Sequence, residues 1–195
     1  MMTSIFIAFS CLMAAVDPGR TSSAMPITPN ERCSSASTIA VAPTASGITY
    51  GQTLASSTLS SGTASVPGEF AFTTTSTAPD AGTAAQGVTF TPSSTANYNT
   101  ATTTANVTVA KATPTVTWAT PSAIPYGTAL SATQLNATAS VAGSFTYTPA
   151  SGTALTAGSQ TLSVGFTPTD AANYHAVAAT TVSLTVDRAN QTISF

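Results

Sequence analysis

The chain has 195 residues, of which four are Lys or Arg, six are Asp or Glu and one is His. A charged fraction of 5%, against about a quarter in ordinary globular domains, leaves few side chains for acid–base chemistry, phosphate binding or metal ligation. The formal charge of −2 provides no basic surface for a nucleic-acid backbone or an anionic membrane. We therefore expect no nucleic acid, no membrane insertion by the folded part and no cofactor.

Residues 1–37 are interpreted as a signal segment followed by a disordered leader. The apolar run from Ile5 to Val16 is shorter than the ~20 residues that a membrane helix needs. Most secretory signals have a Lys or Arg before their apolar run, and this one has none. A cleaved signal peptide and a leader unrelated to the mature domains both stay open. The residues after Val16 are polar and contain several prolines, which is typical of disorder. Cys11 and Cys33 lie in this segment, so neither can staple the domains that follow.

The remainder of the chain contains one internal repeat with a period of about 76 residues. Residues 48–54 return as 124–130, and the triplet at 90–92 returns as 166–168. We predict repeat 1 at 38–112 and repeat 2 at 113–189. The segment after repeat 1 also recurs after repeat 2: Lys111-Ala112 is followed by an apolar segment at 116–118, and Arg188-Ala189 by one at 193–195. Residues 190–195 are therefore predicted as the first strand of a truncated third repeat.

Both repeats alternate apolar residues with Thr, Ala or Gly, as in Phe70-Ala71-Phe72, Val107-Thr108-Val109 and Val164-Gly165-Phe166. A period of two is typical of half-buried strands. The 40 Thr residues suit the exposed face, because a branched Cβ fits a pleated strand while the hydroxyl stays in water. The pattern predicts an all-β fold of two tandem antiparallel β-sandwich modules.

The apolar positions of the alternating segments give the predicted core. In repeat 1 these residues are Val66, Phe70, Phe72, Val88, Phe90, Tyr98, Val107 and Val109. In repeat 2 they are Val141, Phe145, Tyr147, Val164, Phe166, Tyr174, Leu184 and Val186.

Several short motifs recur in both repeats. They are the Tyr-Gly pairs Tyr50-Gly51 and Tyr126-Gly127, a Phe-Thr-Pro followed by Ala-Asn-Tyr, and the closing segment 107–112. As a set these motifs resemble the tandem bacterial Ig-like repeats of cell-surface proteins, including the MBG type with its Tyr-Gly signature. The resemblance implies Ig-like sandwiches. Some related surface repeats are β-grasp-like instead, and the sequence leaves that alternative open.

The resemblance also implies a structural role for the Ala-Asn-Tyr segments. In Ig-type sandwiches a tyrosine corner ties the start of a strand to nearby backbone. Tyr98, Tyr174 and Asp170 are the candidates for this role. Ser94 stands in repeat 1 where repeat 2 has Asp170, so the polar half of the corner differs between the repeats.

The titratable residues form no catalytic or metal-binding pattern. His175 is a lone His, and its nearest carboxylates in sequence are Asp170 and Asp187, whereas a metal site needs three or four convergent ligands. Glu69 and Asp80 lie in repeat 1 and have no carboxylate at the matching positions of repeat 2. We expect no metal site and no enzymatic activity, because a positioned acid, base and nucleophile are missing.

Tyr50, Tyr126 and Trp118 are the residues that a carbohydrate-binding hypothesis selects, because aromatic rings stack on sugars. Their repeated, strand-like positions favour a role in the core or at a module junction.

Two functions are compatible with these features. The first is a non-enzymatic structural or spacer repeat of a bacterial extracellular or cell-surface protein, whose partners are neighbouring repeats of the same array. The second is an adhesion module that binds a glycan or a host protein through sandwich-end loops such as 55–64 and 79–86.

Overall fold

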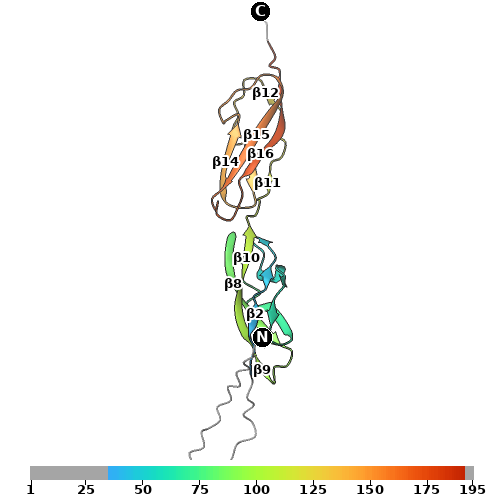
Figure 1. The fold of residues 1–195 in the computed structure, drawn as a ribbon. Helices are drawn as coiled ribbons and strands as arrows, with labels where there is room; N and C mark the ends of the chain where they lie inside the picture. The colour runs from blue at the N-terminus through green and yellow to red at the C-terminus, as the bar shows by residue number, and fades with distance from the viewer. Residues whose placement is uncertain (1–34, 192–195) are drawn as a thin grey trace, which may run out of the picture. The chain divides into compact units, whose positions relative to one another are not determined.

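A computed structural model describes residues 35–191 of the chain, and strands are the main regular structure in this range (Figure 1). Within this range the single helical element is the short 3-10 helix η1 (Leu54–Ser56). The all-β prediction is confirmed, and the strands form two-layered, sandwich-like sheets. The β-grasp alternative does not apply, because that fold packs an α-helix across its sheet. No helix in residues 35–191 is long and apolar enough to cross a membrane.

The strands of the described chain fall into short segments and long, nearly continuous ones. In repeat 1 and just before it they are β1 (Ser35–Ala36), β2 (Ile39–Val41), β3 (Thr44–Ala45), β4 (Ile48–Thr49), β5 (Leu59–Ser60), β6 (Thr63–Ala64), β7 (Gly68–Phe72), β8 (Gly82–Pro92), β9 (Tyr98–Asn99) and β10 (Ala101–Ala110). In repeat 2 they are β11 (Val116–Thr117), β12 (Ile124–Pro125), β13 (Thr138–Ala139), β14 (Gly143–Thr148), β15 (Gly158–Pro168) and β16 (Val177–Asp187).

The same four-stranded sheet occurs in both repeats. Its strand order is β4-β10-β8-β7 in repeat 1 and β12-β16-β15-β14 in repeat 2, and Figure 1 shows β14, β15 and β16 side by side. The pairs β7/β8, β14/β15 and β15/β16 are antiparallel, as predicted. The short strands β4 and β12 instead pair parallel with β10 and β16. One edge of each antiparallel sheet is therefore completed by a parallel strand.

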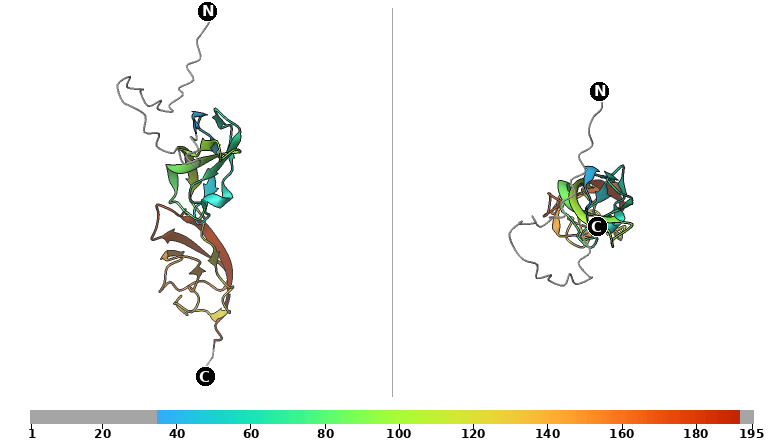
Figure 2. Two further views of the ribbon diagram at one scale, coloured as in Figure 1. Left: turned by 90° about the horizontal axis from the view of Figure 1, so that it is seen from below. Right: turned by 60° about the horizontal axis from the view of Figure 1, so that its bottom comes forward.

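A second, smaller layer faces each sheet. In repeat 1 it contains the antiparallel pairs β2/β6 and β3/β5, and in repeat 2 it contains β11/β13. In repeat 2 the buried Trp118 and Leu135 of this layer share one apolar core with Leu162, Val164 and Leu184 of the sheet. Figure 2 gives two further views of the layers, with β16 in red.

Two expectations for the ends and loops change. Ser35–Ala36, within the predicted leader, is strand β1 and pairs parallel with β9, while residues 1–34 lie outside the described range. Much of the two predicted loops is also strand: 55–64 contains β5 and β6, and β8 already begins at Gly82. The predicted first strand of a third repeat is described only at its first two residues, 190 and 191, which are exposed and form no strand.

The internal contacts of the chain define two compact units. Unit 1 consists of the described part of Met1–Ser46 together with Ser57–Thr75 and Ala84–Val107. Unit 2 consists of Gly47–Ser56, Ser76–Thr83 and the chain from Thr108 onward. Unit 2 therefore contains repeat 2 together with β4 and the adjoining ends of β8 and β10. The predicted repeat boundary at 112/113 stays a prediction.

The two largest fully buried side chains of the described residues are phenylalanines at equivalent positions of the two repeats. Phe90 and Phe166 are 1% and 2% exposed, and each packs on the half-buried ring of the neighbouring strand, Phe70 or Phe145, at centroid distances of 4.9 and 5.0 Å. The predicted residues that are only half-buried are Val66, Phe70, Tyr98, Val141, Phe145, Tyr147 and Tyr174. Buried residues that the alternation did not identify include Ile48, Leu54, Ile124, Leu130 and Leu162.

Each buried phenylalanine covers a glycine on the adjacent strand. A Cβ atom at Gly143 would lie 2.4 Å from Phe166 Cζ and 2.4 Å from the carbonyl oxygen of Thr167. At the equivalent Gly68, a Cβ atom would lie 2.5 Å from Phe90 Cζ. These glycines are therefore required by packing, because the ring occupies the space of a side chain.

Phe166→Ala is expected to lower the free energy of unfolding by about 3 to 5 kcal/mol, because it leaves a cavity where a fully buried ring packs on the sheet. Tyr126→Ala removes an aromatic side chain that is 56% exposed, and it is expected to change stability by less than about 0.5 kcal/mol. Urea denaturation followed by far-UV circular dichroism measures both. Equal midpoints for the two variants would show that the core is placed wrongly.

Gly143→Ala is expected to destabilise repeat 2 by about 1 to 3 kcal/mol, because the added methyl group overlaps the Phe166 ring and the backbone. Gly165→Ala is the matched control, since a Cβ atom at this position would meet no atom within 4 Å. We expect its melting temperature to stay close to that of the natural chain. Differential scanning calorimetry compares the two, and an unshifted transition for Gly143→Ala would contradict the packing argument.

Candidate functional site: the turn around Asn173

The turn that precedes Tyr174 is closed by hydrogen bonds to Asp170. Tyr174 N donates to the Asp170 carbonyl oxygen at 3.1 Å, and Asn173 N donates to Asp170 Oδ1 at 3.1 Å. Asn173 Nδ2 donates to Asp170 Oδ2 at 2.9 Å. Asp170 therefore fixes the Asn173 side chain through one carboxylate oxygen and its backbone through the other.

Repeat 1 contains the same turn with a serine in place of the aspartate. Tyr98 N donates to the Ser94 carbonyl oxygen at 3.0 Å, and Asn97 Nδ2 donates to Ser94 Oγ at 2.9 Å. Serine and aspartate thus perform the same task, which is to orient an asparagine. The tyrosine-corner role of Tyr98, Tyr174 and Asp170 stays a prediction.

The backbone carbonyl of each asparagine also accepts a hydrogen bond from the segment that leads into its repeat. Ala112 N donates to the Asn173 carbonyl oxygen at 3.0 Å, and His175 N donates to the Ala112 carbonyl oxygen at 2.9 Å. In repeat 1, Ser35 N donates to the Asn97 carbonyl oxygen at 2.8 Å. The connection into repeat 2 is thus a hydrogen-bonded segment at Ala112.

The Asn173 side chain makes further contacts that Asn97 lacks. Its Oδ1 accepts a hydrogen bond from Ala81 N at 2.8 Å, and its Nδ2 donates to Asp80 Oδ1 at 3.4 Å. All these residues belong to unit 2. Asn173 is 8% exposed, whereas Asn97 is exposed. A buried amide needs partners for both its acceptor and its donors, and Asn173 has them.

Two more contacts in unit 2 lie beside this asparagine. Lys111 Nζ donates to the Ala171 carbonyl oxygen at 2.6 Å. The rings of Tyr50 and Tyr174 meet edge to face, with centroids 5.3 Å apart and an interplanar angle of 84°, an arrangement that aromatic pairs favour. Residues of the strands and turns before repeat 2 thus contact the turn between β15 and β16 through a lysine, a backbone amide and a ring.

The environment of Tyr50 keeps its phenol neutral. Desolvation raises the pKa of Tyr50 above its ordinary value of 10.0, and the nearby Tyr174, Asp170 and Asp80 raise it further because their negative forms repel a phenolate. A phenol whose pKa is raised by folding is destabilising only when the pH exceeds its unfolded value of about 10. At neutral pH this contact is therefore insensitive to pH.

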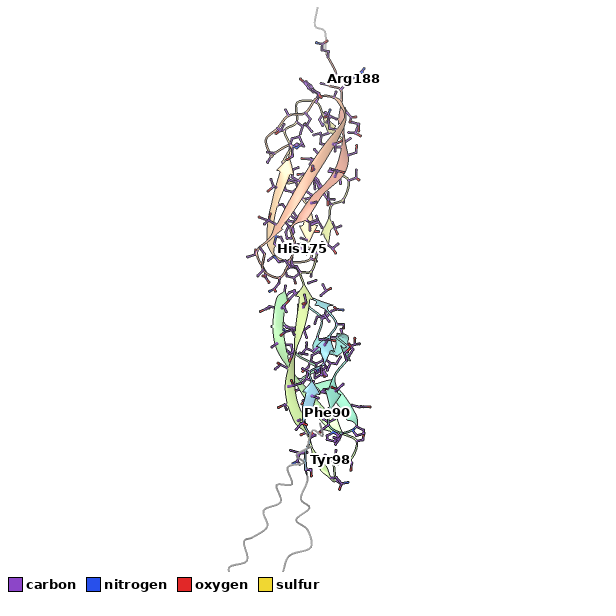
Figure 3. The ribbon with its side chains drawn as sticks, viewed as in Figure 1. Phe90, Tyr98, His175 and Arg188 are labelled. Atoms are coloured by element: carbon purple, nitrogen blue, oxygen red, sulfur yellow. The ribbon has the colours of Figure 1, made fainter. Side chains whose placement is uncertain are left out.

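The chemistry of the site is that of hydrogen-bonded packing. Asp80 and Asp170 lie in different repeats of the sequence, where they form no recognisable pair. In the structure both carboxylates accept a hydrogen bond from Asn173 Nδ2. Along residues 35–191, no group of three or more His, Cys, Asp or Glu side chains is positioned to hold a metal ion. His175 is exposed and enters the site only through its backbone. Figure 3 shows His175 and Arg188 near opposite ends of β16.

The three aromatic candidates are divided between different environments. Trp118 is buried, donates from Nε1 to the Gln134 carbonyl oxygen at 3.0 Å and packs on Tyr147. Tyr50 is half-buried against Tyr174, and Tyr126 is exposed. The structure therefore does not form a single aromatic surface from them.

The remaining candidates lie apart from the turn. Glu69 is an exposed residue of β7, and Asp187 is the exposed last residue of β16. Glu69 borders an open hollow of about 290 Å³ with Leu59 and Phe70. Cys11 and Cys33 lie outside the described residues.

Comparison with known proteins identifies no family for this chain. No known protein family matches the sequence, and no curated protein matches it either. Among solved structures, the fibronectin(III)-like modules of Clostridium thermocellum CbhA align with 82% of this chain and 100% of their own, at 16% identity and a TM-score of 0.31. A likeness this weak carries no argument about function.

Asn173→Ala is expected to lower the free energy of unfolding by about 1 to 3 kcal/mol, because Ala81 N loses its acceptor in a partly buried position. Asn173→Asp is expected to be at least as damaging, since it replaces the donor group by a third carboxylate beside Asp80 and Asp170. Chemical denaturation measures the loss, and amide exchange at Ala81 shows whether the bond is broken.

Asn97→Ala is the matched control, because Asn97 occupies the same turn position but its side chain, within the described part of the chain, hydrogen-bonds only to Ser94. We expect it to cost less than about 1 kcal/mol. If the two Asn→Ala variants were equally destabilised, the contacts to Asp80 and Ala81 would contribute nothing.

Proposed function

We propose that the chain is a non-enzymatic structural repeat section, of the MBG Ig-like type, of a bacterial extracellular or cell-surface protein. The observation that carries this proposal is the set of contacts around Asn173, which join the turn between β15 and β16 of repeat 2 to Asp80, Ala81 and Lys111. A spacer needs consecutive modules that are held by specific contacts, because a free linker would leave the distance it spans undefined.

The connection between the repeats supports the same function. Ala112 is hydrogen-bonded on both sides to the segment around Asn173, and Pro114 just after it is buried. A flexible linker of Gly and Ser would show none of these features. We infer that the connection transmits position from one repeat to the next.

The exposed sheet faces also support a structural role. Hydroxyl groups pair across neighbouring strands: Thr73 with Thr89 at 2.9 Å, Thr83 with Thr108 at 3.0 Å, and Ser159 with Ser183 at 3.0 Å. Such cross-strand pairs stabilise a sheet. Because these hydroxyls bond to one another, they present fewer free groups to a ligand.

An adhesion module is the second candidate, and the hollow beside Phe70 favours it. This hollow combines the apolar Leu59 and Phe70 with the carboxylate of Glu69, which is a combination that sugar sites use. A glycan array tests it. Binding that is lost in Phe70→Ala, with the fold retained, would favour adhesion over spacing.

Small-angle scattering tests the spacer function on the full chain and on a variant with a second copy of residues 113–189 inserted after Ala189. The long strands have 11 residues, which at about 3.3 Å per residue sets a module length of roughly 36 Å. We expect the maximum dimension to increase by about this length. An increase of only a few ångströms would contradict a spacer, because the added repeat would then be folded back on the others.

A further inference from the structure

We propose that the far end of repeat 2 is a docking surface for the Asn-Tyr turn of a repeat that follows in the same chain. The surface, named here the terminal surface, consists of Tyr126, Thr156, Ala157 and Arg188. It corresponds position by position to Tyr50, Asp80, Ala81 and Lys111, which contact the turn of repeat 2. This inference rests on the proposed spacer function and specifies its partner.

The backbone of the terminal surface has the same geometry as its counterpart in repeat 1. Tyr50 N donates to the Ala110 carbonyl oxygen at 2.8 Å, and Tyr126 N donates to the Asp187 carbonyl oxygen at 2.8 Å. The glycine after each tyrosine has the same φ of 91°. The two tyrosines are therefore presented by the same turn.

The second part of the surface also matches. Ala81 and Ala157 each precede the first residue of a long strand, and that residue is a glycine with a positive φ, Gly82 at 130° and Gly158 at 120°. Ala81 N donates to Asn173 Oδ1. Ala157 is exposed, and along residues 35–191 its amide has no acceptor. A backbone donor is thus available where an asparagine Oδ1 would complete it.

The exposure of the two tyrosines points the same way. Tyr50 is half-buried because its ring meets the edge of Tyr174, whereas Tyr126 is 56% exposed and is one of the few large apolar side chains left in water along residues 35–191. Arg188 keeps the cationic donor that Lys111 provides to a turn carbonyl. An aromatic edge and a carbonyl oxygen are what an Asn-Tyr turn offers to these two groups.

One position differs between the two surfaces. Asp80 accepts a long hydrogen bond of 3.4 Å from Asn173 Nδ2, and Thr156 stands in its place. Thr156 accepts from Gln160 Nε2 through both its carbonyl and hydroxyl oxygens. The incoming asparagine keeps its partner within its own turn, as Asn97 does with Ser94, so the replacement removes the weakest contact of the set.

The occupant is a covalently following repeat rather than a second copy of the chain. Ala112 directly follows Lys111 and pairs with the residues on both sides of Tyr174. The turn is therefore hydrogen-bonded to the segment that connects repeat 1 to repeat 2. Ala189 follows Arg188 in the same way. In a second copy, Ser35 already pairs with Asn97 and would occupy the place that Ala189 needs.

Amide hydrogen exchange tests the docking in the full chain extended by a second copy of residues 113–189 after Ala189. We expect the Ala157 amide to exchange at least ~10-fold more slowly than in the natural chain, because it becomes hydrogen-bonded and shielded. Ala81 is the internal reference and should be slow in both chains. Strand amides of the added copy report whether it has folded.

Two variants of the extended chain make the test specific. Replacing the asparagine equivalent to Asn173 by Ala in the added copy alone should return Ala157 to its fast rate while the added copy remains folded. Tyr126→Ala should have the same direction of effect. An unchanged rate at Ala157 in the extended chain, with the added copy folded, would overturn the proposal.

The exchange measurement, read together with scattering and glycan binding, separates this inference from the proposed spacer function on which it rests. If mixing two natural chains slows Ala157 as much as the covalent extension does, the occupant is a second copy and the proposal is wrong. If scattering shows a full added length while Ala157 stays fast, docking fails and the spacer function survives. If a glycan binds and Ala157 is still protected, the spacer function fails and docking survives.

Discussion

The side chain of Asn173 is the constraint on which the rest of unit 2 depends. It is 8% exposed, and a buried amide that lacks partners costs about 1 to 3 kcal/mol. Along residues 35–191, its oxygen accepts a hydrogen bond from Ala81 N alone, and its nitrogen donates to Asp170 and Asp80. A carboxylate at this position would have no donor to offer, and a hydroxyl would not reach both sides. These requirements fix the turn, the entering strand and the strand ends of repeat 1 relative to Asn173.

The parts of the fold that the sequence predicted are those with a local period. Alternation identified buried positions of the long strands, including Phe90 and Phe166 near the ends of β8 and β15, because residues two apart share a face of a strand. It did not identify Leu54, which lies in a 3-10 helix, or Leu130, which lies outside any regular element, because neither position belongs to an alternating segment. It also did not identify the parallel edge strand β4, whose two residues are too short to show a pattern.

The candidate site was predicted only in part, and the reason is sequence distance. The Asn-Tyr turns were recognised because they recur, but their partners were not. Asp80 lies 93 residues before Asn173, and nothing local marks a carboxylate that meets an amide so far along the chain. The tyrosine-corner role of Tyr98, Tyr174 and Asp170 stays a prediction, and the contact that the sequence did not predict is that of the Asp170 carboxylate with Asn173. Ser94 makes the equivalent contact with Asn97 in repeat 1.

The low charge of the chain determines which kinds of contact can hold the Asn173 turn against the end of repeat 1. With 5% charged residues, ion pairs are not available in number, and each hydrogen bond around Asn173 joins at most one charged group to a neutral partner. Salt screens the attraction between two exposed charges strongly, but it affects a bond between a lysine and a carbonyl, or an amide and a carboxylate, much less. Contacts of this kind are therefore expected to persist as the ionic strength rises, whereas contacts made by surface ion pairs would weaken.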